Sequence, residues 1–204
     1  MRCLMFVMIA LSVVGCSSVR ATSPARSAQE LLLISTAADR AAEALAAQVP
    51  PNLTAFIDPS GFAAQDQAYG LAAIQEALLR RGVRVVGDKA QAQAIIAPRS
   101  GALSTYERHT ILGVPSLPAT TPFAGGVTLP ALSLYENTVE KGVAKFAASI
   151  YDPKTGKLIV STAPAYGFSR QSDGILLFLY TWSRNDIGVD LRKNPPAVKI
   201  PTGT

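Results

Sequence analysis

The sequence is poor in the side chains that build covalent, redox and metal sites. Among 204 residues it has two cysteines, Cys3 and Cys16, a single histidine, His109, and one tryptophan. Both cysteines lie in the first 16 residues, so the remaining chain has no thiol for a disulfide or a zinc–thiolate site. We therefore expect no metal and no cofactor, and a fold stabilised by packing alone.

The chain also lacks dense runs of one charge. Charged residues make up 16% of the sequence, and 19 Lys and Arg against 14 Asp and Glu give a net charge of +5. The basic residues are spread along the chain, which favours a solvated surface over a nucleic-acid or lipid-headgroup patch. Because 49% of the residues are apolar, the composition predicts a folded chain, of a length typical of one domain.

Complete catalytic motifs are absent as well. No G-x-S-x-G occurs, and "DPKTGK" lacks the opening glycine of a phosphate-binding loop. Glu107 and His109 would share one face of a strand and could form an acid/base pair or half a metal site. The shortage of further ligands favours a solvated histidine at a loop edge. We expect a protein that is not an enzyme, with this pair as the residual enzymatic alternative.

The first residues resemble a bacterial export signal. An apolar run of about 11 residues, Leu4 to Val14, follows Arg2 and is too short to span a bilayer. It ends in Val-Val-Gly-Cys, which resembles the lipobox of bacterial lipoproteins. That resemblance implies a signal peptide over 1–15, cleavage between Gly15 and Cys16, and acyl chains such as palmitate on Cys16. Ser17 after the cysteine implies transfer to the periplasmic face of the outer membrane in a diderm host.

The residues after this signal are small and polar. Residues 16–26 include Pro24 and have the composition of a flexible tether. About ten residues at roughly 3.5 Å each would keep the folded body within about 35 Å of the bilayer.

The pattern of the first half of the predicted domain, from residue 27, indicates alternating helices and strands. Ser27 and Glu30 form a capping box that opens a helix of about 20 residues, along which Leu31, Ile34, Ala38, Ala41 and Leu45 form an apolar stripe. A strand over 53–58, a helix over 65–81 that ends at Gly82, and strands at 83–86 and from residue 94 follow. This order predicts a βαβ-like unit.

The second half has strand periodicity after an interruption. The many prolines and glycines of 109–130 predict an irregular loop. Strands over 131–136, 144–150 and 157–162, the last two joined by the "DPKTG" turn, predict a meander. The predicted fold class is α/β (α+β): one domain over 27–190 with two main helices packed on a mixed sheet, a C-terminal hairpin or meander, and a disordered tail over 191–204.

Several segments together resemble a known group of proteins. They are "RSAQELLLISTAADRA", "LGVPS", "EKGVAKFAASIYDPKTGKLIVSTAPAYG" and "LLFLYTWSRNDIG". Their order resembles a family of bacterial lipoproteins described only as a domain of unknown function. The strand–helix–strand pattern with its D-x-x-T-G hairpin is more distantly similar to envelope lipoproteins with an α/β domain like the amino-terminal domain of the Tol-Pal propeller protein, including the curli-secretion lipoprotein. The resemblance implies an envelope lipoprotein and no particular activity.

Two C-terminal features complete the prediction. Tyr166, Phe168, Arg170 and Trp182 are candidate contacts for a partner, because aromatic residues and arginine are enriched in binding surfaces. The apolar run 175–182 predicts a buried strand or short helix that closes the core. The expected function is a non-enzymatic lipoprotein at the outer membrane that binds an envelope protein. The alternative is a periplasmic protein that holds a lipid or small apolar ligand between the run 175–182 and the sheet.

Overall fold

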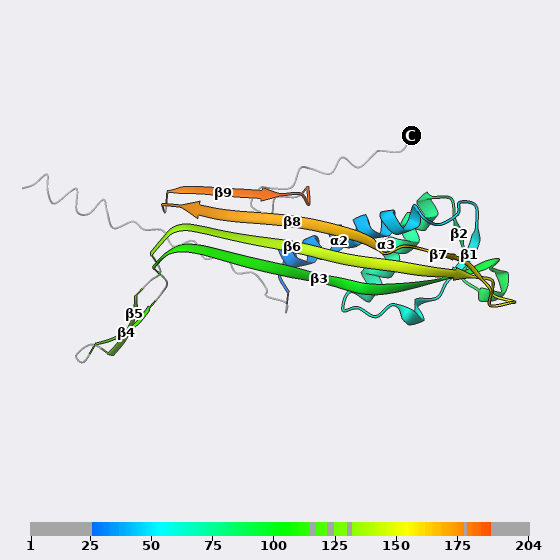
Figure 1. Ribbon diagram of the computed structural model, residues 1–204, viewed down its shortest axis with the longest axis horizontal. Coiled ribbons are helices and arrows are strands. Elements are labelled where there is room, and N and C mark those ends of the chain that lie inside the picture. The colour runs from blue at the N-terminus through cyan, green and yellow to red at the C-terminus, as the bar shows by residue number, and fades with distance from the viewer. Residues whose placement is uncertain (1–25, 115–116, 122–124, 130–131, 178, 189–204) are drawn as a thin grey trace, which may run out of the picture.

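The computed structural model describes residues 26–114, 117–121, 125–129, 132–177 and 179–188 (Figure 1). The predicted signal peptide with Cys16, the tether up to residue 25 and the tail over 191–204 lie outside these residues. The helices are α2 (Ala28–Ala46) and α3 (Gln67–Arg80), with short 3-10 turns η1 (Pro59–Gly61) and η2 (Lys89–Gln91). The strands are β1 (Thr54–Ile57), β2 (Arg84–Val85), β3 (Ala94–Val114), β4 (Leu117–Thr121), β5 (Gly125–Leu129), β6 (Leu132–Tyr151), β7 (Leu158–Ser161), β8 (Ala165–Leu176) and β9 (Tyr180–Asn185).

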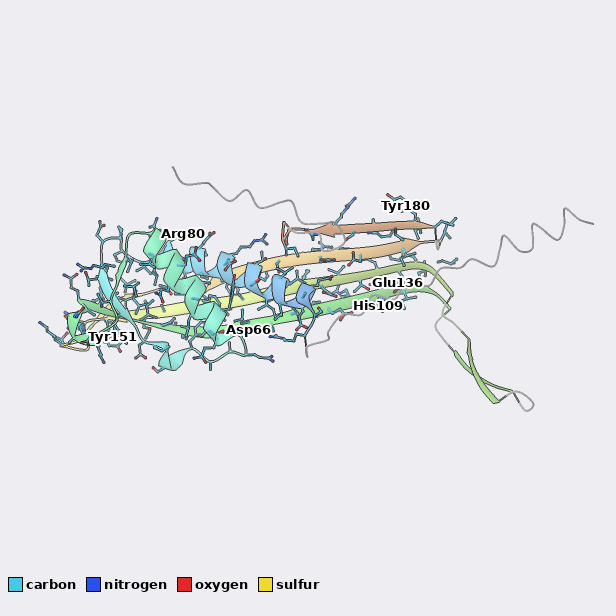
Figure 2. All side chains as sticks on the ribbon, turned by 180° about the vertical axis from the view of Figure 1, so that it is seen from behind. Asp66, Arg80, His109, Glu136, Tyr151 and Tyr180 are labelled. Carbon is cyan, nitrogen blue, oxygen red and sulfur yellow. The ribbon has the colours of Figure 1, made fainter. Side chains whose placement is uncertain are left out.

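Seven strands form one mixed sheet in the order β2-β1-β3-β6-β8-β9, with β7 paired to β6. β1 pairs in parallel with β2 and β3, and the other neighbours are antiparallel. The α/β prediction is therefore confirmed, including the strand–helix–strand unit of β1, α3 and β2. Both helices lie on one side of the sheet and cover only the half that contains β1 and β2 (Figures 1 and 2). Within the described residues, no helix is long and apolar enough to cross a membrane.

Helix α2 begins where the capping box predicted. The Ser27 side chain accepts a hydrogen bond from the Glu30 amide at 3.1 Å. Ile34, Ala38, Ala41 and Leu45 of the predicted stripe are buried, whereas Leu31 is 41% exposed. The stripe thus forms the core face of α2, except for Leu31 at its start.

The alanine-rich stripe lets α2 approach the sheet backbone closely. A Cβ on Gly142 of β6 would lie 2.2 Å from the Leu33 carbonyl oxygen, and one on Gly167 of β8 would lie 1.9 Å from that of Ala37. The buried Ser169 hydroxyl donates to the Leu33 carbonyl oxygen at 2.6 Å. Small residues on the helix and on the two strands therefore allow α2 to pack closely against β6 and β8.

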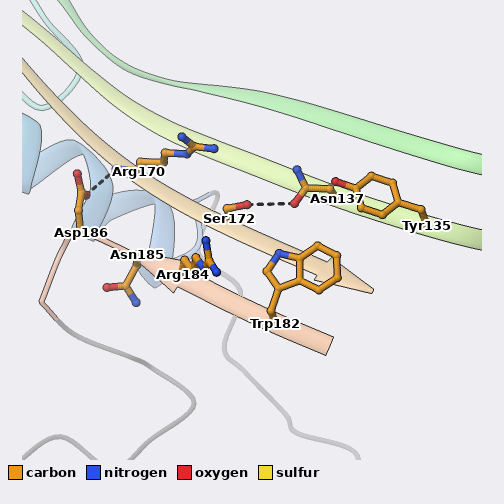
Figure 3. Close-up of a pocket in the computed structure, with 8 residues that line it drawn as sticks. All are labelled: Tyr135, Asn137, Arg170, Ser172, Trp182, Arg184, Asn185 and Asp186. Atoms are coloured by element: carbon orange, nitrogen blue, oxygen red, sulfur yellow. Dashed lines mark hydrogen bonds between the residues drawn. The ribbon is translucent and has the colours of Figure 1, made fainter. Parts of the chain in front are cut away.

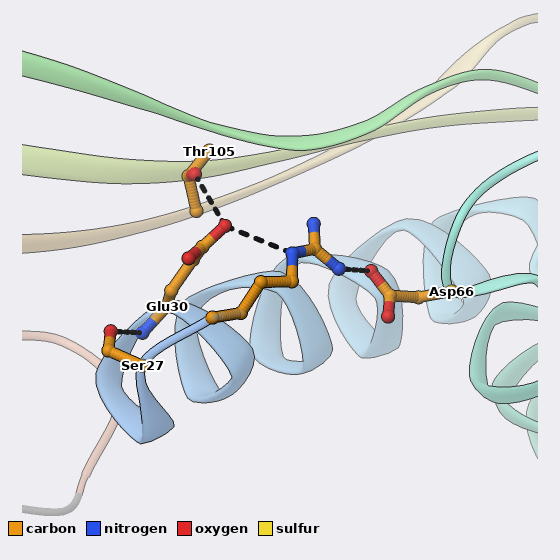
Figure 4. Close-up of polar contacts among 5 residues, drawn as sticks. Ser27, Glu30, Asp66 and Thr105 are labelled. Atoms are coloured by element: carbon orange, nitrogen blue, oxygen red, sulfur yellow. Dashed lines mark hydrogen bonds and ion pairs between the residues drawn. The ribbon is translucent and has the colours of Figure 1, made fainter. Parts of the chain in front are cut away.

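A polar cluster joins the start of α2 to α3 and the sheet (Figure 4). The Arg26 guanidinium donates to Glu30 at 3.1 Å and to Asp66, which precedes α3, at 2.5 Å. The Glu30 carboxylate also accepts from the Thr105 hydroxyl of β3 at 3.4 Å. The hydrogen bond to Asp66 raises the pKa of Arg26 above its ordinary value. Three elements thus meet at one ion-pair cluster.

The irregular loop predicted for 109–130 is wrong. β3 continues to Val114, β4 and β5 form a two-stranded sheet, and β6 starts at Leu132. Gly113 lies at a register shift between β3 and β6, and Pro118 lies in a two-stranded sheet in which each strand is an edge. Such positions tolerate glycine and proline, so these residues did not interrupt the strands.

The prediction that the run 175–182 is buried is also wrong. The run is divided between the end of β8 and the start of β9, and Leu177, at φ +49°, lies in the turn between them. Leu179 is 91% exposed and Tyr180 is 65% exposed. The segment is part of the sheet, so it cannot enclose a ligand against the sheet as the apolar-ligand alternative supposed.

Candidate partner-binding face

The four strands β3, β6, β8 and β9 have two faces of different chemistry. One face carries Thr105, Gly142 and Gly167, which meet α2, and we call it the helix face. No helix of the described residues covers the opposite face, which is the face seen in Figure 1. Because successive side chains alternate between faces and paired residues share one, the register assigns each residue to a face. We call the second face the open face; its aromatic and basic residues are Arg99, Tyr106, Arg108, Tyr135, Lys141, Lys145, Tyr151, Tyr166, Phe168, Arg170, Tyr180, Trp182 and Arg184.

Charge of opposite sign is separated between the two faces. All six Lys and Arg residues of these strands lie on the open face, and all four carboxylates lie on the helix face. The carboxylates are Glu107, Glu136, Glu140 and Asp173. A surface on which the strands present cations and no carboxylates attracts anionic partners and steers their approach.

Aromatic rings and cations alternate across the open face. The rings of Tyr166 and Phe168 on β8 are parallel, with centroids 6.2 Å apart, and these side chains are 51% and 55% exposed. Lys145 Nζ lies 5.6 Å from the Tyr166 centroid, and the Arg108 guanidinium carbon lies 5.9 Å from the Tyr106 centroid. Exposed aromatic rings beside arginine are the composition found at the centres of protein interfaces.

The structure brings all four predicted contact residues to this face. Tyr166, Phe168 and Arg170 alternate along β8, and Trp182 comes from β9, where it pairs with Gly174. Trp182 and Arg170 line a cleft of about 370 Å³ at the β9 edge of the open face (Figure 3). Whether these residues bind a partner stays a prediction.

The predicted Glu107–His109 pair lies on the other face. His109 is in strand β3 rather than at a loop edge, and its Nε2 lies 2.9 Å from Glu136 Oε1 on β6 (Figure 2). Glu107 is opposite Glu140 in the register. Across the described ranges, no group of three or more His, Cys, Asp or Glu side chains has a geometry that could hold a metal ion.

The clustering of charge on one face was not predicted from the sequence. The basic residues are dispersed along the chain, but Arg170 stands two and four residues after Phe168 and Tyr166, a spacing that places all three on one face of a strand. Lys141 and Lys145, four residues apart, likewise lie on one face of their strand. This alternation, combined with the antiparallel pairing of the strands, would have revealed the open face. The pairing of 109–130 was not predicted.

Comparison with protein-family models found none that matches the chain, and a search of curated proteins found no match. The resemblance to envelope lipoproteins therefore stays a prediction from the sequence.

Proposed function

We propose that this chain is a lipid-anchored lipoprotein of the cell envelope, without enzymatic activity, that binds an acidic protein partner through the open face at the periplasmic side of the outer membrane. The observation that carries the proposal is the separation of charge in the sheet. Six cations and a set of exposed aromatic rings share the uncovered face, and the carboxylates of the same strands lie on the other. Charge complementarity therefore favours an acidic partner.

The rings of Tyr166 and Phe168 would form the centre of the contact. They are stacked, half-exposed and flanked by Lys145 and Arg170. Aromatic anchors of this kind typically contribute at least about 2 kcal/mol each to an interface when truncated. Removal of both should thus weaken partner binding by more than tenfold.

Chemical crosslinking in membranes followed by purification of the tagged chain tests this proposal. The double variant Tyr166→Ser, Phe168→Ser should lose a partner that the wild-type chain recovers. Leu79→Ser on α3 is the matched control, because Leu79 is about as exposed, at 49%, and its helix lies on the other side of the sheet. Equal recovery of the partner by all three chains would contradict the proposal.

The lipid anchor has a separate test at Cys16. A Cys16→Ser chain should fail to incorporate labelled palmitate and should keep its signal sequence, because the thiol is the acceptor that the lipobox resemblance implies. Palmitate labelling and the size of the chain on a gel measure both. Unchanged palmitate labelling of the Cys16→Ser chain would mean that the acyl group is attached to another residue.

A second candidate function, binding of an apolar ligand, has one observation in its favour. A cavity of about 520 Å³ lies beside α2 and is lined mainly by apolar side chains, among them Leu31, Leu32, Ile34 and Tyr69. Its size is that of a small-molecule site. Native mass spectrometry of the detergent-extracted protein should show a bound lipid that Leu31→Gln reduces; an empty wild-type protein would remove this candidate.

A further inference from the structure

The cleft at the β9 edge of the open face combines cations, aromatic rings and uncharged hydrogen-bonding groups. Its volume is about 370 Å³, within the usual range of small-ligand sites (Figure 3). The lining comes from three strands: Tyr135 and Asn137 of β6, Arg170 and Ser172 of β8, and Trp182 and Arg184 of β9. The sheet register thus holds these six side chains together, and Asn185 and Asp186, at and directly after the end of β9, complete the lining.

The two arginines give the cleft a positive charge that the described residues do not neutralise. Within the described part of the chain, the guanidinium groups of Arg170 and Arg184 form no hydrogen bond or ion pair. Asp186 also lines the cleft, but its carboxylate accepts from the Arg40 guanidinium at 3.0 Å and from the Arg170 amide at 2.7 Å. Two guanidiniums are therefore available for a carboxylate or phosphate, which they bind with charge-assisted hydrogen bonds.

The tryptophan ring is held in place before any ligand arrives. A Cβ on Gly174 would lie 2.1 Å from the Trp182 ring, so the indole packs directly on the β8 backbone. Its centroid lies 5.9 Å from that of Tyr135 and 6.0 Å from that of Tyr180. A fixed aromatic cluster of this kind offers an apolar surface for the C–H face of a ring-shaped ligand.

Hydroxyl-binding groups adjoin the same surface. The Ser172 hydroxyl donates to Asn137 Oδ1 at 3.0 Å, which orients the Asn137 amide. Amide and hydroxyl groups beside an aromatic ring suit the hydroxyls of a sugar, and the guanidiniums suit an acidic substituent. We propose that this cleft binds an anionic saccharide, a sugar ring that carries a carboxylate or a phosphate.

This site goes beyond the proposed partner-binding function. The partner contact is centred on Tyr166 and Phe168, which are not among the residues that line the cleft. A Tyr166→Ser, Phe168→Ser chain should therefore still bind the saccharide, so failure of one proposal leaves the other intact.

Trp182 is the only tryptophan of the chain and reports on the cleft directly by fluorescence. The detergent-extracted full chain is titrated with N-acetylglucosamine, with N-acetylmuramic acid as its carboxylate form, with phosphorylated N-acetylglucosamine, and with inorganic phosphate. We expect at least one acidic sugar to change the Trp182 emission with an affinity at least tenfold above that of the neutral sugar and of phosphate. Which acidic sugar binds identifies the carboxylate or the phosphate as the natural group.

Variants tie the signal to the cleft. Arg184→Gln should weaken binding of the acidic sugar by about tenfold, the loss expected for one charge-assisted hydrogen bond. Arg99→Gln, on the open face but outside the cleft, should leave it unchanged. Arg170→Gln replaces the first variant if that chain does not fold. Equal affinity for the neutral sugar or for phosphate, no emission change with any probe, or no effect of either cleft variant would overturn the proposal.

Discussion

Lys145 and Tyr166 are cross-strand neighbours on β6 and β8, and the Lys145 ammonium lies 5.6 Å from the centre of the Tyr166 ring. The next pair on this face along the strands brings Val143 opposite Phe168, and the one after it brings Lys141 opposite Arg170. The register thus sets cations and aromatic rings side by side on a surface that no helix of the described residues covers.

Reversal of one charge on the open face should weaken partner binding. Lys145→Glu places a carboxylate beside Tyr166 and should reduce the amount of crosslinked partner by about tenfold, because like charges at an interface repel. Lys154→Glu in the turn between β6 and β7 changes the net charge equally and lies away from the face. Quantitative immunoblots of the adduct measure both; equal losses would mean that net charge, rather than this face, controls binding.

A methyl group at Gly167 should displace α2 from the sheet. The new Cβ would lie 1.9 Å from the Ala37 carbonyl oxygen and 2.6 Å from the Ala41 amide nitrogen, and neither backbone group can move aside cheaply. We expect Gly167→Ala to lower the free energy of unfolding by about 3 kcal/mol or more. Urea denaturation measures the change. The control Gly87→Ala meets no atom within 4 Å and should stay within about 0.5 kcal/mol of wild type.

Loss of the Arg26 guanidinium should destabilise the junction of α2, α3 and β3. Arg26→Met leaves the carboxylates of Glu30 and Asp66, which are 28% and 23% exposed, without their cation. We expect a loss of about 1–2 kcal/mol, less than for a fully buried pair because solvent still reaches both groups. Thermal unfolding at neutral pH measures it. Arg84→Met on β2 is the control, and an equal loss there would contradict the role of the cluster.

The turn after β6 should be sensitive to acid. The Asp152 carboxylate accepts hydrogen bonds from the Thr155 and Lys154 amides, and these bonds lower the pKa of Asp152 below its ordinary value of about 3.9. Because the folded pKa lies below the unfolded one, the stabilisation is complete above about pH 4 and is lost as pH falls through the folded pKa. An NMR titration should show the Lys154 and Thr155 amide shifts following Asp152, and Asp152→Asn should abolish that transition. A midpoint at or above about 3.9 would contradict the account.

Local signals in the sequence predicted the helical half of the fold. The Ser27 cap of α2, the left-handed Gly82 after α3 and the Asp152–Gly156 turn are all found in the structure, because each depends on contacts between residues close in the chain. The separate strands expected at 131–136 and from 144 proved to be parts of β6. Their continuity depends on pairing with β3 along almost its whole length, a contact between distant segments.

The composition of the run 175–182 gave no indication of the exposed hairpin of β8 and β9. The run 175–182 contains no Gly, Pro, Asn or Asp that would mark a turn, so it reads as one buried element. Its turn at Leu177 adopts a left-handed backbone conformation that a branched side chain rarely takes. The four predicted contact residues were identified by residue type, whereas the separation of charge between the faces required the register.

Site-specific photocrosslinking in intact membranes tests the central claim most directly. A photoreactive phenylalanine analogue is placed either at Phe168 on the open face or at Glu107, which is exposed on the helix face. We expect a discrete protein adduct from position 168, weakened by Lys145→Glu, and none of that size from position 107. An equal adduct from both positions, or an adduct from position 107 alone, would contradict the assignment of the open face as the binding surface.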